Sequence, residues 1–453
     1  GNMALLIYNI ILKRNSPFKG KREAALAMDN NVTNKHRKTA GLLSIIPGMG
    51  QLYNKQYVKG IIFLVLTVAF FSSFYQTLNW GFWGLITLGE IPGLDHSVFL
   101  LVDGVIALLV AAIGLGIYAF NIYDAYNNGK KRDEGFELNS VREQYHNLLD
   151  NGFPYLMISP GFLLLIFVVI FPIFFVILLS FTNYDLYHTP PAKLVDWVGI
   201  QNYIDIFKLE LWRSTFFSVL GWTIVWTFGA TTLQVAVGIF LAVVINQKDL
   251  KGKAVFRTIL ILPWAVPAFI SILIFSGMFN ESFGVINDGI LSFLGIDPVP
   301  WMTSEMWTRI ALIGIQSWLG FPFVFAMTTG VLQSIPDELY EAANVDGASI
   351  WQKFRSITLP MVLYATAPII ITQYTFNFNN FNVIFLFNGG GPALPGQNAG
   401  GTDILISWIY KLTMTSAQYG KAAAITMLLS LVVVAVALWQ FKRTNSFKEE
   451  DMM

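Results

Sequence analysis

Long apolar windows are the feature that most constrains this chain. A helix needs about 20 apolar residues to cross the hydrocarbon core of a bilayer. Windows of this kind recur at residues 58–75, 98–123, 153–181, 215–245, 258–279, 310–332, 361–387 and 422–441. Backbone amides find no water inside a bilayer, so segments of this length must cross it as helices. The sequence therefore predicts an all-α integral membrane protein with eight transmembrane helices.

The composition agrees with a membrane protein and argues against several other classes. Hydrophobic residues make up 55% of the 453 residues and charged residues only 13%, which is too apolar for a soluble globular domain. The net charge of +1 gives no indication of nucleic-acid binding. Cys is absent, and the four His residues, His36, His96, His146 and His188, are scattered without ligand spacing. We therefore expect neither a metal site nor a cofactor in this chain.

The positions of the basic residues predict the orientation in the membrane. Most of the 29 Lys and Arg residues lie in or beside the segments that share a side with the N-terminus. Cytoplasmic loops are enriched in Lys and Arg, and an even number of spans returns the chain to its starting side. We therefore expect both termini in the cytoplasm, together with the polar segment between the sixth and seventh windows.

The same pattern divides the chain into five parts. A turn-rich approach from Pro47 to Gln56 leads into the first two windows, and a basic stretch follows the second. The predicted parts are a basic cytoplasmic N-terminal segment (1–57), a peripheral transmembrane hairpin (58–126), a cytoplasmic linker (127–152), a six-helix core (153–441) and a cytoplasmic tail (442–453). At the extreme N-terminus, Gly1 to Ala27 is interpreted as an interfacial helix or a leader, with Met28 as a candidate start.

Ionisable residues are rare inside the apolar windows, and this limits the energy sources that such a protein could use for transport. A charge at the centre of a spanning helix costs about 2.5 to 3.5 kcal/mol and is usually kept for handling protons or ions. The six later windows carry none away from their ends, and Asp103 in the second window lies near its outer end. A Gly-rich phosphate loop is missing too, because Gly420-Lys421 continues with Ala422. The pattern argues against an ion-coupled carrier, a cation channel with an acidic ring and a self-contained ATPase.

A short acidic motif occupies the polar segment between the sixth and seventh windows. Residues Glu341 to Ala348 read Glu-Ala-Ala-Asn-Val-Asp-Gly-Ala. Pro336 suits a first helical position with Ser334 as its cap, and Gly347 permits a sharp turn. Residues 335–360 are therefore predicted to form a helix, a turn and a second helix that could dock into a cleft on another subunit. The alternative is an ordinary amphipathic loop.

Two apolar windows carry stripes of amide and aromatic side chains. At 100° per residue these side chains fall on one face of each helix. The stripes comprise Gln373, Phe376, Asn377 and Asn380 in the seventh window and Gln316, Gly320 and Phe323 in the sixth. Rings that stack on a sugar and amides that bond its hydroxyls suit a neutral glycan. Helix packing through interhelical amide bonds is an equally favoured alternative on the residues alone.

The acidic motif resembles the Glu-Ala-Ala loop of binding-protein-dependent ABC importer permeases. The match consists of Glu-Ala-Ala, two residues, Asp-Gly-Ala, and then Phe354, Ile357 and Leu359-Pro360 at fixed offsets. In that family the loop is the coupling helix, which seats in a cleft of the ATPase subunit. The resemblance therefore implies a coupling loop at 335–360 with an ATPase-coupling site at Glu341, Ala342, Ala343, Asp346 and Gly347.

The polar stripes resemble the maltose/maltodextrin (MalF-like) branch of the same family. The similarity lies in Phe-Asn-Phe-Asn-Asn-Phe at 376–381, in Asn388-Gly389-Gly390, and in Leu319-Gly320 before Phe-Pro-Phe. In that branch the two helices hold the sugar midway across the membrane, which implies that all seven stripe residues bind substrate. Departures at Gln316, Phe323 and Gln373, where the branch has Asn, Tyr and Ser, imply a different or longer glycan.

The outer segment 182–214 is short where the enteric members of the branch have a folded domain. Contact with a binding protein is therefore expected at other outer loops, namely 388–401 and 402–414. For the Gly-rich part, a flexible loop without a dedicated role is an equally good interpretation.

The resemblance also implies a function and a set of partners. The fold would be that of a type I ABC importer permease, and the cargo an oligosaccharide: maltodextrin or maltose first, with galacto-oligosaccharides or another glycan as the alternative. The chain would not be an enzyme. Its expected partners are a second, homologous (MalG-like) permease, two ATPase subunits that bind ATP and Mg, and an extracytoplasmic solute-binding protein, in the plasma membrane of a bacterium. An ion-coupled secondary sugar carrier and a membrane scaffold are the two other classes that the residues leave open.

Overall fold

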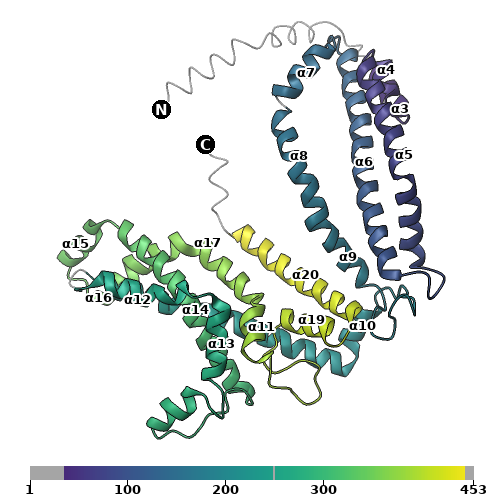
Figure 1. Cartoon of the computed structure of the whole chain (residues 1–453). Helices are drawn as coiled ribbons and strands as arrows, with labels where there is room; N and C mark the ends of the chain where they lie inside the picture. Colours follow the sequence, from purple (N-terminus) through teal and green to yellow (C-terminus); the bar gives the residue numbers. More distant parts are fainter. Residues whose placement is uncertain (1–34, 151, 248–249, 444–453) are drawn as a thin grey trace. The chain divides into compact units, whose positions relative to one another are not determined.

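The computed structural model describes residues 35–150, 152–247 and 250–443. The described residues fall into two compact units, one within residues 1–175 and 190–195 and the other within residues 176–189 and 196–453. Figure 1 shows the helices of both units, coloured along the chain. The predicted interfacial helix or leader at Gly1 to Ala27, with Met28, lies outside the described residues, as does most of the predicted tail.

The first unit is built around a helical hairpin. Its helices are α3 (Lys35–Leu43), α4 (Met49–Tyr53), α5 (Tyr57–Thr87), α6 (Ser97–Asp133), α7 (Val141–Asp150) and α8 (Phe153–Leu165), with the π-helical turn η1 (Ile166–Ile170). The long helices α5 and α6 run side by side (Figure 1). They approach closely because Gly81 faces α6: a Cβ there would lie 2.6 Å from the carbonyl oxygen of Asp103. Small residues allow this kind of backbone contact between membrane helices.

Buried amides close the end of the hairpin where α3 and α4 pack on α6. Asn121 of α6 accepts a hydrogen bond from the backbone N–H of Gly48 at 3.1 Å and donates one to the carbonyl of Ser44 at 2.9 Å. Gln51 donates to the carbonyl of Asn121 at 2.9 Å. Since these groups are buried, pairing avoids a desolvation cost of about 1 to 3 kcal/mol for each.

The third span is a single helix interrupted by one wide turn. Helix α8 passes through η1 into α9 (Phe171–Leu179). Pro172 follows the π turn and lacks the N–H that would complete the regular ladder, a common cause of such irregularities. This helix is among the least buried in the chain, with only 6% of its most apolar window covered.

The second unit contains the remaining helices. They are α10 (Gln201–Lys208), α11 (Glu210–Ile245), α12 (Lys253–Ala265), α13 (Ala268–Met278), η2 (Ile286–Leu291), α14 (Glu305–Ser334), α15 (Asp337–Val345), α16 (Ile350–Lys353), η3 (Phe354–Thr358), α17 (Leu359–Phe378), α18 (Phe381–Asn388), α19 (Leu405–Met414) and α20 (Tyr419–Arg443). Helix α11 packs along α14 and also against α17. One buried cluster joins Trp226, Leu312 and Phe387, and a second joins Trp212, Trp408 and Ile425.

All eight apolar windows lie on helices, and four of them depart from a simple straight span: the third has the π turn, the seventh is broken between α17 and α18, the fifth is bent and the eighth is short. Six helices of the described residues are long and apolar enough to cross a membrane by themselves. The fifth window is the pair α12 and α13, bent by 90°. The bend falls at Val266, which is extended because the ring of Pro267 disfavours the helical conformation in the residue before it. The eighth window holds a shorter apolar helix, Tyr419–Ala435.

The fold is therefore all-α in the part of the chain that is described. Only two isolated β-bridges occur there, Thr182 with Trp197 and Ala393 with Gly400. The count of eight crossings, the cytoplasmic position of both termini and the five predicted domain boundaries stay predictions.

Candidate functional site

Three membrane helices of the second unit meet closely enough for their polar side chains to touch. At Gly320 of α14 a Cβ would lie 2.0 Å from Oε1 of Gln234 on α11, so only Gly leaves room for that amide. On the third helix, α17, the carbonyl of Asn377 accepts a hydrogen bond of 2.8 Å from the indole of Trp226. These contacts hold α11 beside both α14 and α17.

A cluster of uncharged side chains fills this junction, and we call it the amide cluster. Its members are Thr231, Gln234, Gln316, Gln373, Asn377 and Asn380. Gln316 donates to Oε1 of Gln234 at 3.2 Å, and Asn380 donates to Oε1 of Gln316 at 2.9 Å. Asn377 donates to Oγ1 of Thr231 at 2.8 Å. Every member therefore forms a hydrogen bond with the side chain of another member.

Gln234 is the centre of the amide cluster. It is fully buried, and its Oε1 also lies 3.5 Å from Nδ2 of Asn377. Its own Nε2 donates to Oε1 of Gln373 at 3.3 Å. One side chain thus joins α11 to α14 and to α17. Losing it would leave the buried Nε2 of Gln316 without its partner, at about 1 to 3 kcal/mol, and would remove the bond to Gln373.

The structure brings five of the seven predicted substrate residues to this junction. Gln316, Asn377 and Asn380 are buried in the amide cluster, Gln373 is half-buried at its edge, and Gly320 forms the close contact. The interhelical amide bonding that the sequence allowed as an alternative is therefore present. Substrate binding by the same residues stays a prediction.

The two predicted aromatic residues lie apart from the amide cluster. Phe376 is 61% exposed on the surface of the second unit. Phe323 is half-buried and meets Trp264 edge-on, with ring centroids 5.9 Å apart. Because consecutive positions on a helix point in different directions, Phe376 faces outward while its neighbour Asn377 faces the protein.

The prediction of one continuous seventh helix is wrong at a single point. Helix α17 ends at Phe378 and α18 begins at Phe381, so Asn380 is the residue before a new helix. Its backbone has φ −79° and ψ 78°, outside the helical region. Asn380 reaches Gln316 through this break and not through a regular helical stripe.

Sequence reasoning missed the contribution of α11. Thr231 and Gln234 stand three residues apart in the apolar window 215–245, the spacing of one helical face. A Gln in the interior of a spanning helix is a polar group that must find a partner. The sequence therefore indicates that Gln234 needs a hydrogen-bond partner, but it does not indicate which helix supplies that partner.

The predicted coupling loop forms a helix, a turn and a short second helix. In α15 and the following turn Glu341, Ala342, Asp346 and Gly347 are exposed, and Ala343 is half-buried. Gly347 adopts a left-handed φ of 75°, which suits a residue without Cβ. The second helix, α16, begins with a capping box between Ser349 and Gln352.

Internal contacts hold this element, which we call the knuckle (residues 337–358), in shape. Lys353 donates to Oδ1 of Asn344 at 2.7 Å, and the hydroxyls of Tyr340 and Thr358 are 2.9 Å apart. Its apolar side chains Val345 and Ile350 are 87% and 80% exposed. Exposed apolar groups on a preformed polar element are typical of a surface that docks another protein.

The predicted cap at the start of α15 is wrong. Ser334 belongs to the end of α14, where its hydroxyl donates to the carbonyl of Val331 at 2.8 Å. Pro336 is the capping residue instead of the first helical residue. Asp337 and Glu338 still occupy the first turn of α15, where the helix dipole favours negative charge.

The Gly-rich loop after α18 is organised by one buried carboxylate. Asp403 accepts hydrogen bonds from the backbone N–H of Gly400 at 2.7 Å and from the hydroxyl of Ser407 at 2.8 Å, and it pairs with Lys411 at 2.5 Å. Burial raises the pKa of Asp403 above its ordinary value, although Lys411 and these hydrogen bonds oppose the shift. Asp403 thus ties the end of the loop, at Gly400, to the start of α19.

Among the described residues no three or more His, Asp or Glu side chains are grouped so that they could hold a metal ion. The amide cluster itself contains only neutral oxygen and nitrogen donors.

Comparison with known proteins places these features in a family. Residues 234–445 match the family described as binding-protein-dependent transport system inner membrane component. The galactooligosaccharides transport system permease protein GanP of Bacillus subtilis (strain 168) is 63% identical over 417 residues, covering 92% of this chain and all of GanP. The maltodextrin transport system permease protein MdxF of the same organism is 50% identical over 427 residues, covering 92% of this chain and 98% of MdxF.

Two further comparisons are more distant. The maltose/maltodextrin transport system permease protein MalF of Salmonella typhimurium (strain LT2) is 42% identical over 253 residues, covering 55% of this chain and 49% of MalF. Among solved structures, that of a bacterial ABC transporter that imports the acidic polysaccharide alginate matches with a TM-score of 0.54 at 23% identity, covering 66% of this chain and 96% of the matched one. The second match concerns the fold alone.

These similarities confirm the resemblance inferred from the acidic motif and the polar stripes. They also agree with the apolar helices of the structure and with the absence of a phosphate loop in the sequence. The chain belongs to the family of binding-protein-dependent transport system inner membrane components, as a multi-pass permease subunit of an ABC importer in the bacterial cell membrane and not as an enzyme.

Proposed function

We propose that this chain is the permease subunit through which an ATP-driven importer takes up a neutral oligosaccharide. The observation that carries the proposal is the amide cluster, in which uncharged donors and acceptors from α11, α14 and α17 converge. Neutral amides match the hydroxyl groups of a sugar without requiring charge. The relatives that transport galactooligosaccharides and maltodextrin support the same class of cargo.

Binding would exchange one set of hydrogen bonds for another. In this structure the amides of Gln316, Asn377 and Asn380 bond to one another and to Gln234. A sugar hydroxyl both donates and accepts, so it can replace an amide partner without leaving a buried group unsatisfied. The ring of Phe376 is exposed and lies apart from these amides, so its stacking on a sugar unit stays a prediction.

Energy would enter through the knuckle. Its exposed Glu341, Asp346, Val345 and Ile350 form a compact surface that fits a cleft on an ATPase subunit. We infer an assembly with two such ATPases, which would hold ATP and Mg, a second homologous (MalG-like) permease and an extracytoplasmic binding protein. This chain would need no cofactor of its own.

Galacto-oligosaccharides are the first cargo to test, and maltodextrins are the second. The identity to GanP, 63%, exceeds the identity to MdxF, 50%, over nearly the same share of the chain. The replacement of a Ser by Gln373 in one stripe, taken from the family resemblance, also favours a cargo that differs from maltose.

The proposed site is tested by Asn377→Ala. Asn377 is buried and bonded to Thr231 on α11, whereas Asn379 two residues later is exposed and donates only to the carbonyl of Thr375. We expect Asn377→Ala to lower uptake of labelled galacto-oligosaccharide at least tenfold while the subunits still copurify. Asn379→Ala should keep uptake near the wild-type rate. Normal uptake by the Asn377 variant would remove this face from the sugar path.

A further inference from the structure

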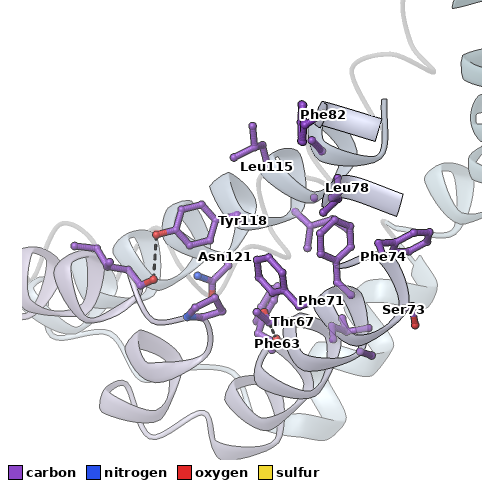
Figure 2. A pocket seen from close by; sticks show the side chains of 18 residues that line it. Phe63, Thr67, Phe71, Ser73, Phe74, Leu78, Phe82, Leu115, Tyr118 and Asn121 are labelled. Atoms are coloured by element: carbon purple, nitrogen blue, oxygen red, sulfur yellow. Dashed lines mark hydrogen bonds between the residues drawn. The ribbon is translucent and has the colours of Figure 1, made fainter. Parts of the chain in front are cut away.

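The hairpin of the first unit contains an apolar cavity that takes no part in the proposed sugar path. The cavity has a volume of about 760 Å³ and lies between α5 and α6. Figure 2 shows the rings of Phe63, Phe71 and Phe74 on one side and Leu115 and Tyr118 on the other. Its lining is almost entirely apolar, and Phe71 and Leu115 are exposed, so the cavity opens at the surface of the unit.

The fold itself keeps this space open. At one end of the hairpin α5 and α6 are held together at Gly81 and Gly104, where added Cβ atoms would lie within 3 Å of the other helix. At the other end, the left-handed Gly48 lies against the carbonyl of Gly60. These contacts lie toward the two ends of the hairpin, and bulky side chains between them line the cavity. The lining on α5 runs from Phe63 to Phe82, roughly 28 Å at 1.5 Å per residue.

That length matches the apolar layer of a membrane. The hydrocarbon core of a bilayer is about 30 Å thick, and α5 and α6 are both long and apolar enough to cross it. A cavity that opens at the surface of these two helices faces the acyl chains of lipids. Aromatic rings form a large part of its wall.

Basic residues are frequent in the segments that continue beyond the Phe63 end of the cavity. We call this group the basic foot: Lys35, Arg37, Lys38, Lys55, Lys59, Lys130, Lys131 and Arg132. Lys59 stands one helical turn from Phe63 and pairs with Asp124 at 2.6 Å, one turn beyond the lining residue Asn121. Segment 35–59 contains no Asp or Glu, whereas Asp124 and Asp133 on α6, Glu134 directly after it, and Glu137, which lines a pocket with Lys55 and Arg132, offset part of the charge.

The arrangement of apolar and basic residues predicts that the basic foot lies at a membrane surface. Leu42, Ile45 and Ile46, at and just after the end of α3, are more than 60% exposed, whereas the basic residues Lys35 and Lys38 begin the same helix. Apolar residues beside lysines are typical of an element that lies in the headgroup layer. The distribution of charge predicts that this end faces the cytoplasm, where the leaflet is anionic.

We propose that the cavity binds an anionic phospholipid of the bilayer, with one acyl chain between α5 and α6 and the phosphate at the basic foot. The cavity supplies the apolar wall, and the foot supplies the charge that selects the headgroup. The site does not depend on the sugar path, because its residues lie outside the amide cluster and the knuckle.

The acyl-chain half of the proposal is tested by filling the cavity. Ala111 lines it, whereas Ala112 is exposed on the same helix and does not line it. The full-length chain, purified with its partner subunits and stripped with mild detergent, should retain one phospholipid by native mass spectrometry. Ala111→Phe should lose that lipid, and Ala112→Phe should keep it. Equal retention in both variants, or no retained lipid in the wild type, would overturn the proposal.

The headgroup half needs a second comparison. Phosphatidylglycerol and phosphatidylcholine with the same acyl chains compete for the delipidated protein, and the wild type should prefer phosphatidylglycerol at least fivefold. The combined variant Lys38→Gln, Lys55→Gln and Lys131→Gln should reduce this preference to near one, whereas Lys208→Gln at an exposed position of α10 should not change it. Equal binding of both lipids by the wild type would overturn the anionic assignment.

Another polypeptide in the cavity is the competing outcome. Because the chain contains no Cys, Ser73→Cys at the cavity rim provides a single thiol in this subunit. Cross-linking from this thiol to a partner subunit would show that a protein helix occupies the cavity and would overturn the lipid proposal. Labelling by a thiol-reactive lipid probe alone would support it.

Discussion

Gly320 shows how one missing side chain controls the amide cluster. A Cβ at this position would meet Gln234 at 2.0 Å, and Gln234 is the side chain that joins three helices. Interior groups are packed too tightly to absorb an added methyl without moving. The position of the most central amide therefore depends on a residue that makes no hydrogen bond through its own side chain.

We expect Gly320→Ala to disturb the cluster by displacing Gln234. Overpacking of this kind costs about 1 to 3 kcal/mol, which should lower the melting temperature of the purified assembly and reduce sugar uptake. Gly314→Ala on the same helix is the matched control, because nothing lies within 4 Å of a Cβ there. Ala is favoured over Gly in a helix by roughly 0.5 to 1 kcal/mol, so the control should be as stable as the wild type or slightly more so. Identical behaviour of the two variants would contradict this account.

At the scale of elements, the knuckle is a rigid turn between two helices. Its shape depends on the left-handed Gly347 and on the capping box at Ser349. Both features are local, so the sequence predicted the turn correctly from Gly347 alone. The surface it presents is defined by side chains that have no other role in the fold, such as Val345.

Gly347→Asp should uncouple ATP hydrolysis from uptake. The substitution places a side chain and a negative charge on the surface that would enter the ATPase cleft, where a desolvated charge is costly. We expect weaker association with the ATPase and uptake reduced at least tenfold, and Glu341→Lys should act in the same direction. Gly252→Asp is the control for backbone strain alone, because Gly252 has the same φ of 75° and open space around it. Full uptake with Gly347→Asp would count against the knuckle as the coupling surface.

The elements also show where sequence reasoning reaches its limit. Apolar windows located the spanning helices because hydropathy and length act locally. The break at Asn379 and the partnership of Asn380 with Gln316 depend on how α14 lies against α17, which no window of one helix contains. Pro267 marks the position of the bend at Val266 in the sequence, but a proline does not specify the angle of 90°. For the same reason the outward position of Phe376 could not be read from its stripe.

At the scale of the whole molecule, the orientation in the membrane decides whether the knuckle can meet an ATPase. The excess of Lys and Arg on one side predicts a cytoplasmic knuckle and an outer Gly-rich loop. The two lie at opposite ends of the span that runs through α17 and α18. The proposed assembly requires that these two ends be on different sides.

Labelling of single thiols tests this orientation. The natural chain has no Cys, so Ile350→Cys and Ala393→Cys, both at exposed positions, each introduce one reactive group into the subunit. A membrane-impermeant maleimide should label Ala393→Cys in intact cells and Ile350→Cys only after permeabilisation. The opposite result would place the knuckle outside and remove the route by which ATP could drive transport.

The neutrality of the amide cluster has an electrical consequence. Its six side chains carry dipoles and no net charge, so exchanging amide partners for sugar hydroxyls moves no charge through the membrane field. An uncharged cargo passing such a junction should cross at a rate that is indifferent to the membrane potential. A bacterium that has lost its membrane potential but still contains ATP would then continue to take up sugar through this protein.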